Sequence, residues 1–148
     1  MPSISRSKIV PYTASQMFAL VNDIQRYPEF IPWCCSSNIL AQTVDEMTAT
    51  LCFARGSLQK CFTTCNRLQL DKMIDVRLVT GPFRRLEGYW RFDKLSDHTC
   101  KISFDMEFDF AGRLISFAFG PLFNQVANTL VDSFSKRAQQ IYGKPDGT

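Results

Sequence analysis

The sequence predicts an α+β fold in which a curved antiparallel sheet of about seven strands wraps around one long C-terminal helix. Between residues 36 and 110, six segments alternate apolar and polar side chains, and short turns separate them. An amphipathic segment from about 121 to 142 follows. Strands joined by short turns pair antiparallel, and the long helix must bury its apolar face on the sheet. A deep curve would enclose a cavity between the two.

The N-terminal part predicts one strand followed by two short helices. Residues 3–10 form the strand. Thr13 and Gln16 have the spacing of a capping box at the start of the first helix. The stretch "QRYPEF" indicates a short second helix or turn. Pro32 ends it, because the residue before a proline avoids the helical region.

The six remaining strands are expected at 38–44, 46–55, 57–70, 73–80, 84–95 and 99–110. The last two have the clearest alternation, with Trp90, Phe104, Met106 and Phe108 on the apolar face. Acidic residues fall on the opposite face, at Glu87, Asp93, Asp105, Glu107 and Asp109. This pattern indicates a solvated outer surface rather than a pair of catalytic carboxylates.

The pattern becomes helical after Gly112, and Gly120–Pro121 interrupts it. Pro121 would start the main helix, and Gly143 and Pro145 would end it. The 148 residues predict a single domain, 1–148, with a disordered tail after about residue 143.

Charge and composition limit the possible partners and compartment. The net charge is +3 and the basic residues are spread out, which does not favour DNA binding. No secretory signal or long apolar run is visible, so we expect a cytoplasmic protein, peripheral at the inner membrane if it meets lipid. The six cysteines are then expected to be reduced thiols.

No catalytic or metal site is predicted. Cys61 and Cys65 should lie about 13 Å apart on one strand, too far to share a zinc ion. Cys34 and Cys35 are neighbours, which strains a disulfide between them. His98 falls in a turn without an orienting partner.

The aromatic residues suggest a binding site, although a packed core explains them equally. Candidate ligand contacts face the long helix, belong to it, or pack at one end of the cavity in the corner after the first helix. They are Phe30, Trp33, Leu51, Phe53, Phe62, Trp90, Phe104, Met106, Phe108, Phe123, Val126, Leu130 and Phe134. Ligand pockets are mostly apolar with few polar groups. Thr64 and Asn66 are candidates to hydrogen-bond a ligand's polar head.

A second candidate surface lies beside the Gly-Pro pair. Leu114, Ile115, Phe117 and Phe119 either start a helix packed on the sheet or form a gate that dips into a membrane surface while ligand passes.

Several blocks resemble the coenzyme-Q-binding, START-like family of the polyketide cyclase/dehydrase-like superfamily. They are "VPYTASQMFALVNDIQRYPEFIPWC", "FTTCNRL", "GPFRRLEGYWRF", "FDMEFDF" and "GPLFNQVANTLVDSFSKRAQQIYG". The resemblance covers nearly the whole chain in order, and its most specific parts are "YPEFIPWC" and "GPFRRLEGYWRF". It implies a helix-grip fold with a lipid-sized apolar tunnel and no catalytic constellation. Cys35 is not part of the family pattern.

The resemblance implies two functions and does not separate them. The first is non-enzymatic binding of ubiquinone or a similar isoprenoid lipid in the tunnel, supporting respiration as a carrier or chaperone, with no other cofactor. The alternative is a ribosome-associating toxin that binds the large subunit and blocks subunit association. Its contacts to RNA phosphates would come from Arg84, Arg85, Arg91, Lys136 and Arg137. A polyketide-cyclase-type enzyme shares the fold, but no residues here support one.

Overall fold

The computed structural model describes residues 3–143, and its elements follow the predicted order. Strand β1 (Ser3–Val10) leads into helix α1 (Ala14–Asn22) and the 3-10 helix η1 (Ile24–Glu29). Six strands follow: β2 (Cys34–Gln42), β3 (Glu46–Arg55), β4 (Leu58–Gln69), β5 (Met73–Thr80), β6 (Phe83–Lys94) and β7 (Cys100–Phe110). Helix α2 (Arg113–Tyr142) completes the fold. The tail predicted to be disordered lies outside the described residues.

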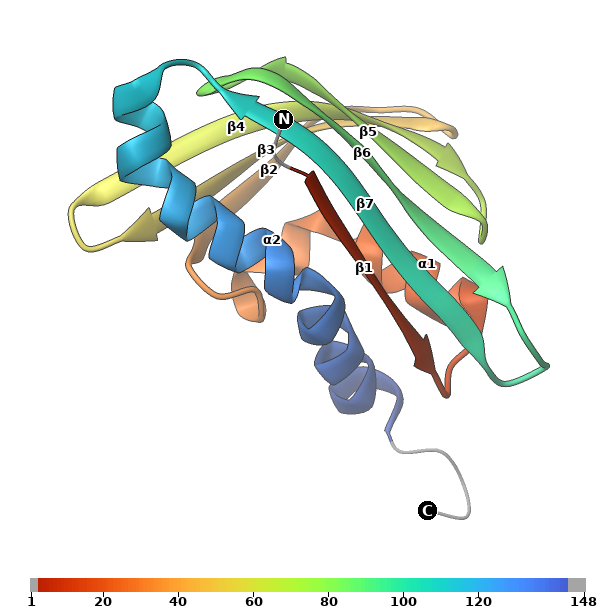
Figure 1. Ribbon diagram of the computed structural model, residues 1–148. Coiled ribbons are helices and arrows are strands. Elements are labelled where there is room, and N and C mark those ends of the chain that lie inside the picture. Colours follow the sequence, from red (N-terminus) through yellow and green to blue (C-terminus); the bar gives the residue numbers. More distant parts are fainter. Residues whose placement is uncertain (1–2, 144–148) are drawn as a thin grey trace.

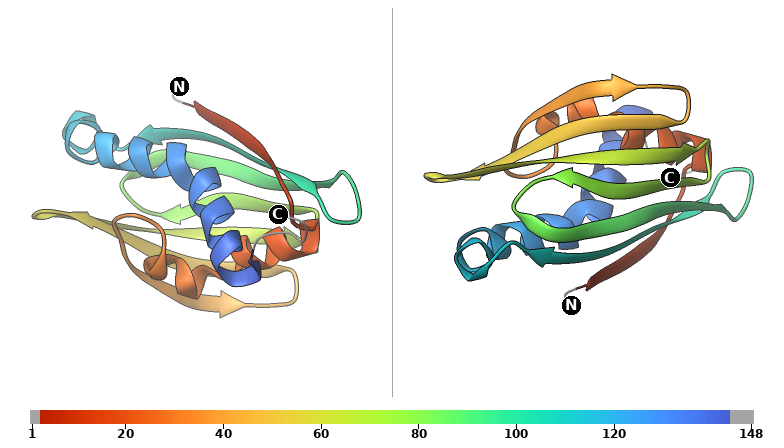
Figure 2. Two further views of the ribbon diagram at one scale, coloured as in Figure 1. Left: turned by 90° about the horizontal axis from the view of Figure 1, so that it is seen from below. Right: turned by 90° about the horizontal axis from the view of Figure 1, so that it is seen from above.

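The seven strands form one antiparallel sheet in the order β1-β7-β6-β5-β4-β3-β2. Strands β2 to β7 pair with their sequence neighbours, as their short connections predict, and β1 adds to the edge beside β7. The sheet curves around α2, which crosses its concave face (Figures 1 and 2). The predicted helix-grip fold is therefore confirmed.

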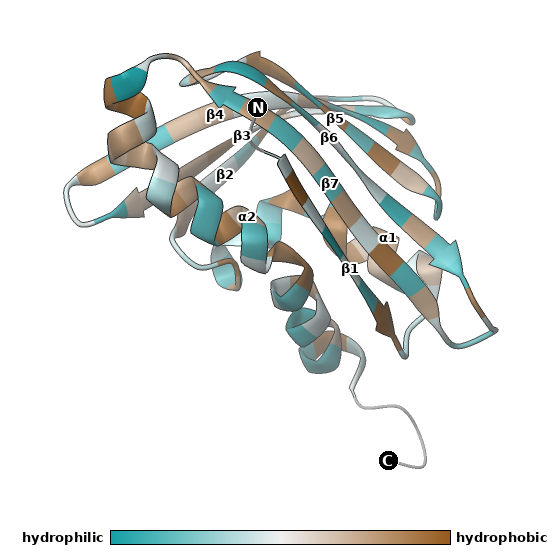
Figure 3. Ribbon diagram, in the orientation of Figure 1, coloured by the Kyte–Doolittle hydropathy of each residue, from teal (hydrophilic) through white to brown (hydrophobic). Residues whose placement is uncertain are grey.

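The alternation of side chains places the core between the sheet and α2. On β7, Phe104 and Phe108 are buried, whereas the intervening Asp105 is partly exposed. Phe123 and Phe134 of α2 face them, and the rings of Phe108 and Phe123 lie 4.9 Å apart. Each buried side chain of this size stabilises the fold by about 1.5–3 kcal/mol. The alternating hydropathy of the strands is visible in Figure 3.

Helix α1 begins with the predicted capping box. The Gln16 amide donates to the Thr13 hydroxyl at 3.1 Å, and the Thr13 amide donates to the Gln16 side chain at 2.9 Å. A cap of this kind contributes about 1 kcal/mol. It fixes the direction of α1, so that Phe18 packs edge-on against Phe92 of β6 at 5.6 Å.

Strand β2 begins at Cys34, whereas the sequence pattern predicted Asn38. Strand pairing is irregular at this point, with a register shift between Cys34 and Ser36. Cys35 and Ser36 are consequently both exposed. A period-two pattern cannot be recognised across such a bulge.

Helix α2 runs without interruption from Arg113, so the predicted break at Gly120–Pro121 is wrong. A proline removes one helical hydrogen bond and bends the helix. The turns before Pro121 are anchored by Phe119, which is completely buried against Phe83 and Phe110. The helix changes direction after these first turns (Figure 1). Among the described residues, α2 is long and apolar enough to cross a membrane, a property that buried core helices share.

Candidate functional site

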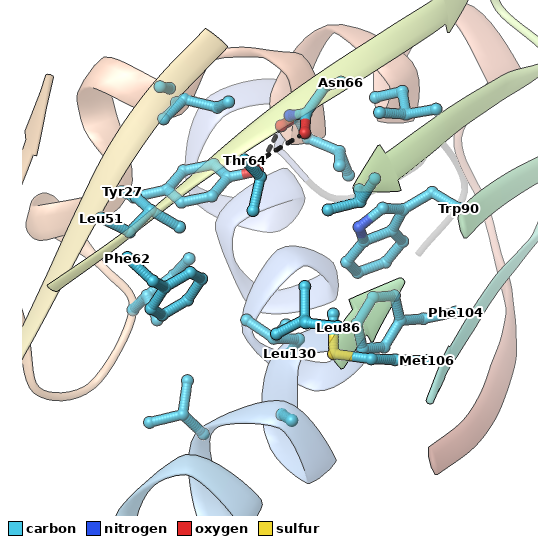
Figure 4. A pocket seen from close by; sticks show the side chains of 18 of the residues that line it. Tyr27, Leu51, Phe62, Thr64, Asn66, Leu86, Trp90, Phe104, Met106 and Leu130 are labelled. Carbon is cyan, nitrogen blue, oxygen red and sulfur yellow. Dashed lines mark hydrogen bonds between the residues drawn. The ribbon is translucent and has the colours of Figure 1, made fainter. Parts of the chain in front are cut away.

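A small apolar cavity lies between the inner face of the sheet and the helices (Figure 4). Strands β3 to β7 form one wall, and α1, η1 and the middle of α2 form the other. Its volume is about 80 Å³. Ligand pockets usually measure about 300–1,000 Å³, and an engineered cavity of about 150 Å³ accommodates benzene. The cavity therefore has room for a few atoms, and an isoprenoid chain would require α2 and the sheet to move apart.

Most of the predicted ligand contacts meet at this cavity. It is lined by Leu51, Phe53, Phe62, Trp90, Phe104, Met106, Phe123, Val126, Leu130 and Phe134. The structure adds Val21, Ile24, Tyr27, Ile31, Ala49, Ile74, Val76, Leu86 and Ala127. The added strand residues follow the same alternation, which could have identified them, whereas Tyr27 and Ile31 carry no such signal. Ligand contact by any of these residues stays a prediction.

Phe108 and Phe30 do not line the cavity. Phe108 is completely buried and belongs to the packed core beside Phe123. Phe30 is half-buried and packs edge-on against Phe134 at 5.3 Å. The guanidinium of Arg137 lies 5.0 Å from the centre of the Phe30 ring. Phe30 therefore supports a cavity residue from outside.

Trp33 also lies outside the cavity lining, half-buried beside the core. Its backbone has a φ of 62°, and its carbonyl accepts the amide of Ala54 at 2.9 Å. The guanidinium of Arg55 covers its ring. Trp33 thus fastens the corner after η1 to the end of β3.

Polar side chains gather at one end of the cavity (Figure 4). Thr64 and Asn66 are both buried, and the Thr64 hydroxyl donates to Asn66 Oδ1 at 3.0 Å. Within residues 3–143, neither Asn66 Nδ2 nor Trp90 Nε1 has a hydrogen-bond acceptor. Free N–H donors of this kind suit a carbonyl oxygen or a water molecule.

Unlike the N–H donors of Asn66 and Trp90, the Tyr27 hydroxyl already has a hydrogen-bond acceptor within the protein. It donates to the backbone carbonyl of Val21. Burial, followed by the charges of Cys34 and Asp23, raises the pKa of Tyr27 above its usual range. The phenol therefore stays neutral at ordinary pH and acts as a structural donor.

The four predicted gate residues have different environments. Leu114 and Phe117 are 85% and 86% exposed, whereas Ile115 packs on the core and Phe119 is completely buried. Leu114, Phe117, Ala118 and Pro121 are exposed at helical spacing, and we call them the apolar stripe. Figure 3 shows this apolar start of α2. Contact between the stripe and a membrane stays a prediction.

Charge is unevenly distributed between the two ends of the sheet. Because neighbouring strands are antiparallel, the β3–β4 and β5–β6 turns and the β7–α2 connection share one end (Figure 1). Arg55, Lys60 and Arg113 lie beside these connections, and none has a carboxylate partner among the described residues. We call these three residues the basic end. The turns at the opposite end contain Asp45, Asp71 and Asp97 together with Lys72, and Lys94 pairs with Asp97.

Four of the five basic residues predicted to contact RNA instead hold carboxylates. The pairs are Arg84 with Asp109, Arg85 with Glu87 and Glu107, Arg91 with Asp93, and Arg137 with Glu29. The hydrogen bond from Arg85 lowers the pKa of Glu87. Lys136 has no carboxylate partner within residues 3–143. The outer face is therefore largely neutralised by its own ion pairs.

The prediction that all six cysteines are reduced thiols is wrong for one pair. Cys52 and Cys61 form a disulfide between β3 and β4. The period-two pattern places both on the outer face, but their pairing depends on the hairpin register. The described residues contain no group of metal-ligating side chains, and His98 is exposed in the β6–β7 turn.

Comparisons with known proteins agree with this architecture. A family model described as polyketide cyclase/dehydrase and lipid transport matches residues 10–135. The ribosome association toxin RatA of Pseudomonas aeruginosa is 49% identical over 140 residues, which cover 95% of this chain and 97% of that protein. The mitochondrial coenzyme Q-binding protein COQ10 homolog B of Xenopus laevis is 30% identical over 148 residues, which cover 96% of this chain and 60% of that protein.

A solved structure of a START superfamily protein from Mycobacterium smegmatis has the same fold. Its TM-score is 0.78 at 17% identity, covering 94% of this chain and 98% of that chain. At this identity the likeness concerns the fold alone.

Proposed function

This chain belongs to the polyketide cyclase/dehydrase and lipid transport family, and we propose that it acts at the ribosome, where it binds the large subunit and blocks association of the two subunits. It does so in the cytoplasm without catalysing a reaction. The name and near full-length similarity of the Pseudomonas aeruginosa relative support this function.

The basic end is the observation that carries the proposal. Ribosomal RNA presents closely spaced phosphates, and cations that hold no carboxylate within the protein can bind them without first releasing one. Arg55, Lys60 and Arg113 meet this condition, whereas the paired arginines of the outer sheet face do not. The apolar stripe begins next to Arg113 and can add contact area. This end of the molecule therefore faces the large subunit.

Sedimentation of purified ribosomes with added protein tests the proposal. We expect the associated ribosome peak to fall and the free subunits to rise. Lys60→Ala/Arg113→Ala should weaken this effect and lower the slope of log affinity against log salt by about 2. Lys72→Ala/Lys94→Ala removes the same charge at the opposite end and should behave like the unmodified chain. Unchanged subunit association with the unmodified chain would overturn the proposal.

Binding of ubiquinone or a similar isoprenoid lipid is the second candidate function. The unpaired donors of Asn66 and Trp90 favour a ligand with carbonyl oxygens, and the Xenopus laevis relative is named for coenzyme Q binding. The volume of about 80 Å³ weighs against it, because the ligand must force α2 and the sheet apart. Native mass spectrometry and solvent extraction of the purified chain test this candidate. A stoichiometric quinone would support it, and a ligand-free protein that also takes up none from vesicles would reject it.

A further inference from the structure

Three cysteines lie side by side on the outer face of neighbouring strands β2, β3 and β4. The disulfide joins Cys52 of β3 to Cys61 of β4, which are directly opposite in the hairpin register. On β2, Cys35 occupies the bulge facing Cys52, and its thiol lies 3.4 Å from the Cys52 carbonyl oxygen. Cys35 and Cys61 are exposed. A free thiol therefore lies beside an accessible disulfide.

The other cysteines are in different environments. Cys34 is buried on the inner face, and burial raises the pKa of its thiol to about 12. Burial likewise raises the pKa of Cys100 to about 11. Cys65 shares the outer face of β4, but its thiol is directed at the carboxylate of Glu46, 3.6 Å away. The thiolate is the reactive form, so the exposed Cys35 is the thiol best placed to react with the disulfide.

The disulfide is not needed to bring its two strands together. The β3–β4 hairpin is paired without interruption from Glu46 opposite Arg67 to Arg55 opposite Leu58. Exposed disulfides of this kind are the ones that thiols open most readily. We propose that Cys35, Cys52 and Cys61 form a thiol–disulfide exchange site, in which the disulfide moves between the β3–β4 and β2–β3 strand pairs and opens to thiols of the glutathione class.

The exchange step is balanced within the protein. The Cys35 thiol loses its proton, and its sulfur forms a bond to the Cys52 sulfur. The Cys52–Cys61 bond breaks, and the Cys61 sulfur leaves as a thiolate that takes up a proton. One disulfide replaces another, so no oxidant or reductant is consumed. When glutathione opens the disulfide, two reduced glutathione molecules are oxidised to one glutathione disulfide. The protein disulfide is reduced to two cysteine thiols.

Exchange would change the surface next to the basic end. Cys52 lies three residues before Arg55, so moving the bond alters which strand is cross-linked to the end of β3. It also leaves Cys61 as an exposed thiol on β4, open to a mixed disulfide with glutathione. The proposed ribosome contact could fail without affecting this chemistry.

Tryptic mapping of the full chain distinguishes the two disulfides. Cys34, Cys35 and Cys52 fall in one peptide, 27–55, whereas Cys61 and Cys65 fall in another, 61–67. After alkylation of free thiols without reduction, the Cys52–Cys61 disulfide links the two peptides. The Cys35–Cys52 disulfide instead gives peptide 27–55 an internal bond and leaves 61–67 fully alkylated. Buffers with a series of reduced-to-oxidised glutathione ratios should show both species.

Single serine variants assign the reacting sulfurs. In Cys61→Ser under oxidised glutathione, we expect the internal bond in peptide 27–55, and in Cys35→Ser we expect its complete loss. Cys34→Ser is the matched control for Cys35, its neighbour in sequence, and Cys65→Ser is the matched control for Cys61 on the same strand. Both controls should form the Cys52–Cys61 and the Cys35–Cys52 disulfides. The proposal fails if Cys61→Ser keeps Cys35 and Cys52 fully alkylatable at every ratio, or if Cys34→Ser abolishes the internal bond.

Discussion

The guanidinium carbon of Arg55 lies 5.3 Å from the centre of the Trp33 ring, and the same group donates to the side chain of Gln125 on α2 at 3.2 Å. One side chain thus joins the tip of the β3–β4 hairpin to the corner after η1 and to the long helix. Trp33 has a φ of 62°, a conformation that bulky residues rarely adopt. Its neighbours must hold it there.

Arg55→Ala should reduce the stability of the whole domain slightly. It removes a cation–π contact at a partly exposed site and one hydrogen bond, for a loss of about 0.5–1 kcal/mol in the free energy of unfolding. Urea denaturation measures this loss. Arg113→Ala removes a charge at the same end without these contacts and should stay within about 0.5 kcal/mol of the unmodified chain. Equal effects of the two variants would mean that Arg55 does not stabilise this corner.

The sequence pattern alone was enough to assign the faces of the strands. Trp90 and Phe104 were both expected to face the long helix, and their rings pack with centroids 4.5 Å apart. This works because the side-chain period of a strand is two wherever pairing is regular. The same reasoning placed Thr64 and Asn66 on the inner face, where they line the cavity.

Features that depend on contacts between distant residues could not be predicted. The break at Gly120–Pro121 followed from local propensity, which the burial of Phe119 overrides. The disulfide depends on the register across the turn at Gly56–Ser57, which decides that Cys52 meets Cys61. The size of the cavity depends on how closely α2 approaches the sheet. The apolar–polar pattern of the sequence does not determine that distance.

The buried pair Thr64–Asn66 should behave non-additively. Thr64→Val leaves the Asn66 carbonyl oxygen without its partner, and Asn66→Leu leaves the Thr64 hydroxyl without one. Each should cost about 1–3 kcal/mol. The double variant removes both polar groups and should be closer to the unmodified chain than the sum of the two losses. Urea denaturation of all four chains completes the cycle, and additive losses would show that the hydrogen bond contributes nothing.

The same double variant separates the two candidate functions. If the pair holds a carbonyl-bearing ligand, Thr64→Val/Asn66→Leu should lose any quinone that the unmodified chain retains. Its effect on subunit association should be unchanged, because both residues are buried on the inner face of the sheet and neither belongs to the basic end. Loss of the ribosome effect in a folded double variant would connect the cavity to that function.

The apolar stripe should bind lipid through its two exposed large residues. Leu114→Asp/Phe117→Asp leaves the core untouched and should change the free energy of unfolding by less than about 0.5 kcal/mol per substitution. Phe119→Asp is unsuitable, since Phe119 is fully buried and its replacement would unfold the protein. We expect the double variant to lose binding to phosphatidylglycerol vesicles in a flotation assay. Val44→Asp alters an even more exposed apolar residue at the opposite end, and this variant should bind the vesicles normally. Equal flotation of the unmodified chain and both variants would show that the apolar stripe does not contact lipid.

Alkaline pH should destabilise the protein through the buried thiol of Cys34. Burial, and then the neighbouring Cys35, raises the pKa of Cys34 from its ordinary value near 9 to about 12. The folded state therefore keeps a proton that the unfolded state releases, so this stabilising contribution is complete below pH 9 and is lost as the pH rises from about 9 towards 12. Cys100 and Tyr27 act in the same direction.

A Cys34→Ala variant isolates this contribution. Both chains should carry Cys35→Ser, so that thiol exchange at high pH does not interfere. At pH 8 the alanine chain should be less stable, because it loses buried sulfur. Its free energy of unfolding should then fall less steeply between pH 9 and 11, so that the gap between the two chains narrows. Urea denaturation at each pH measures the difference in free energy of unfolding between the two chains. A difference that stays constant would mean that Cys34 ionises equally easily in the folded and unfolded states. That outcome is incompatible with a thiol enclosed by Ile31, Phe53 and the β2–β3 pairing.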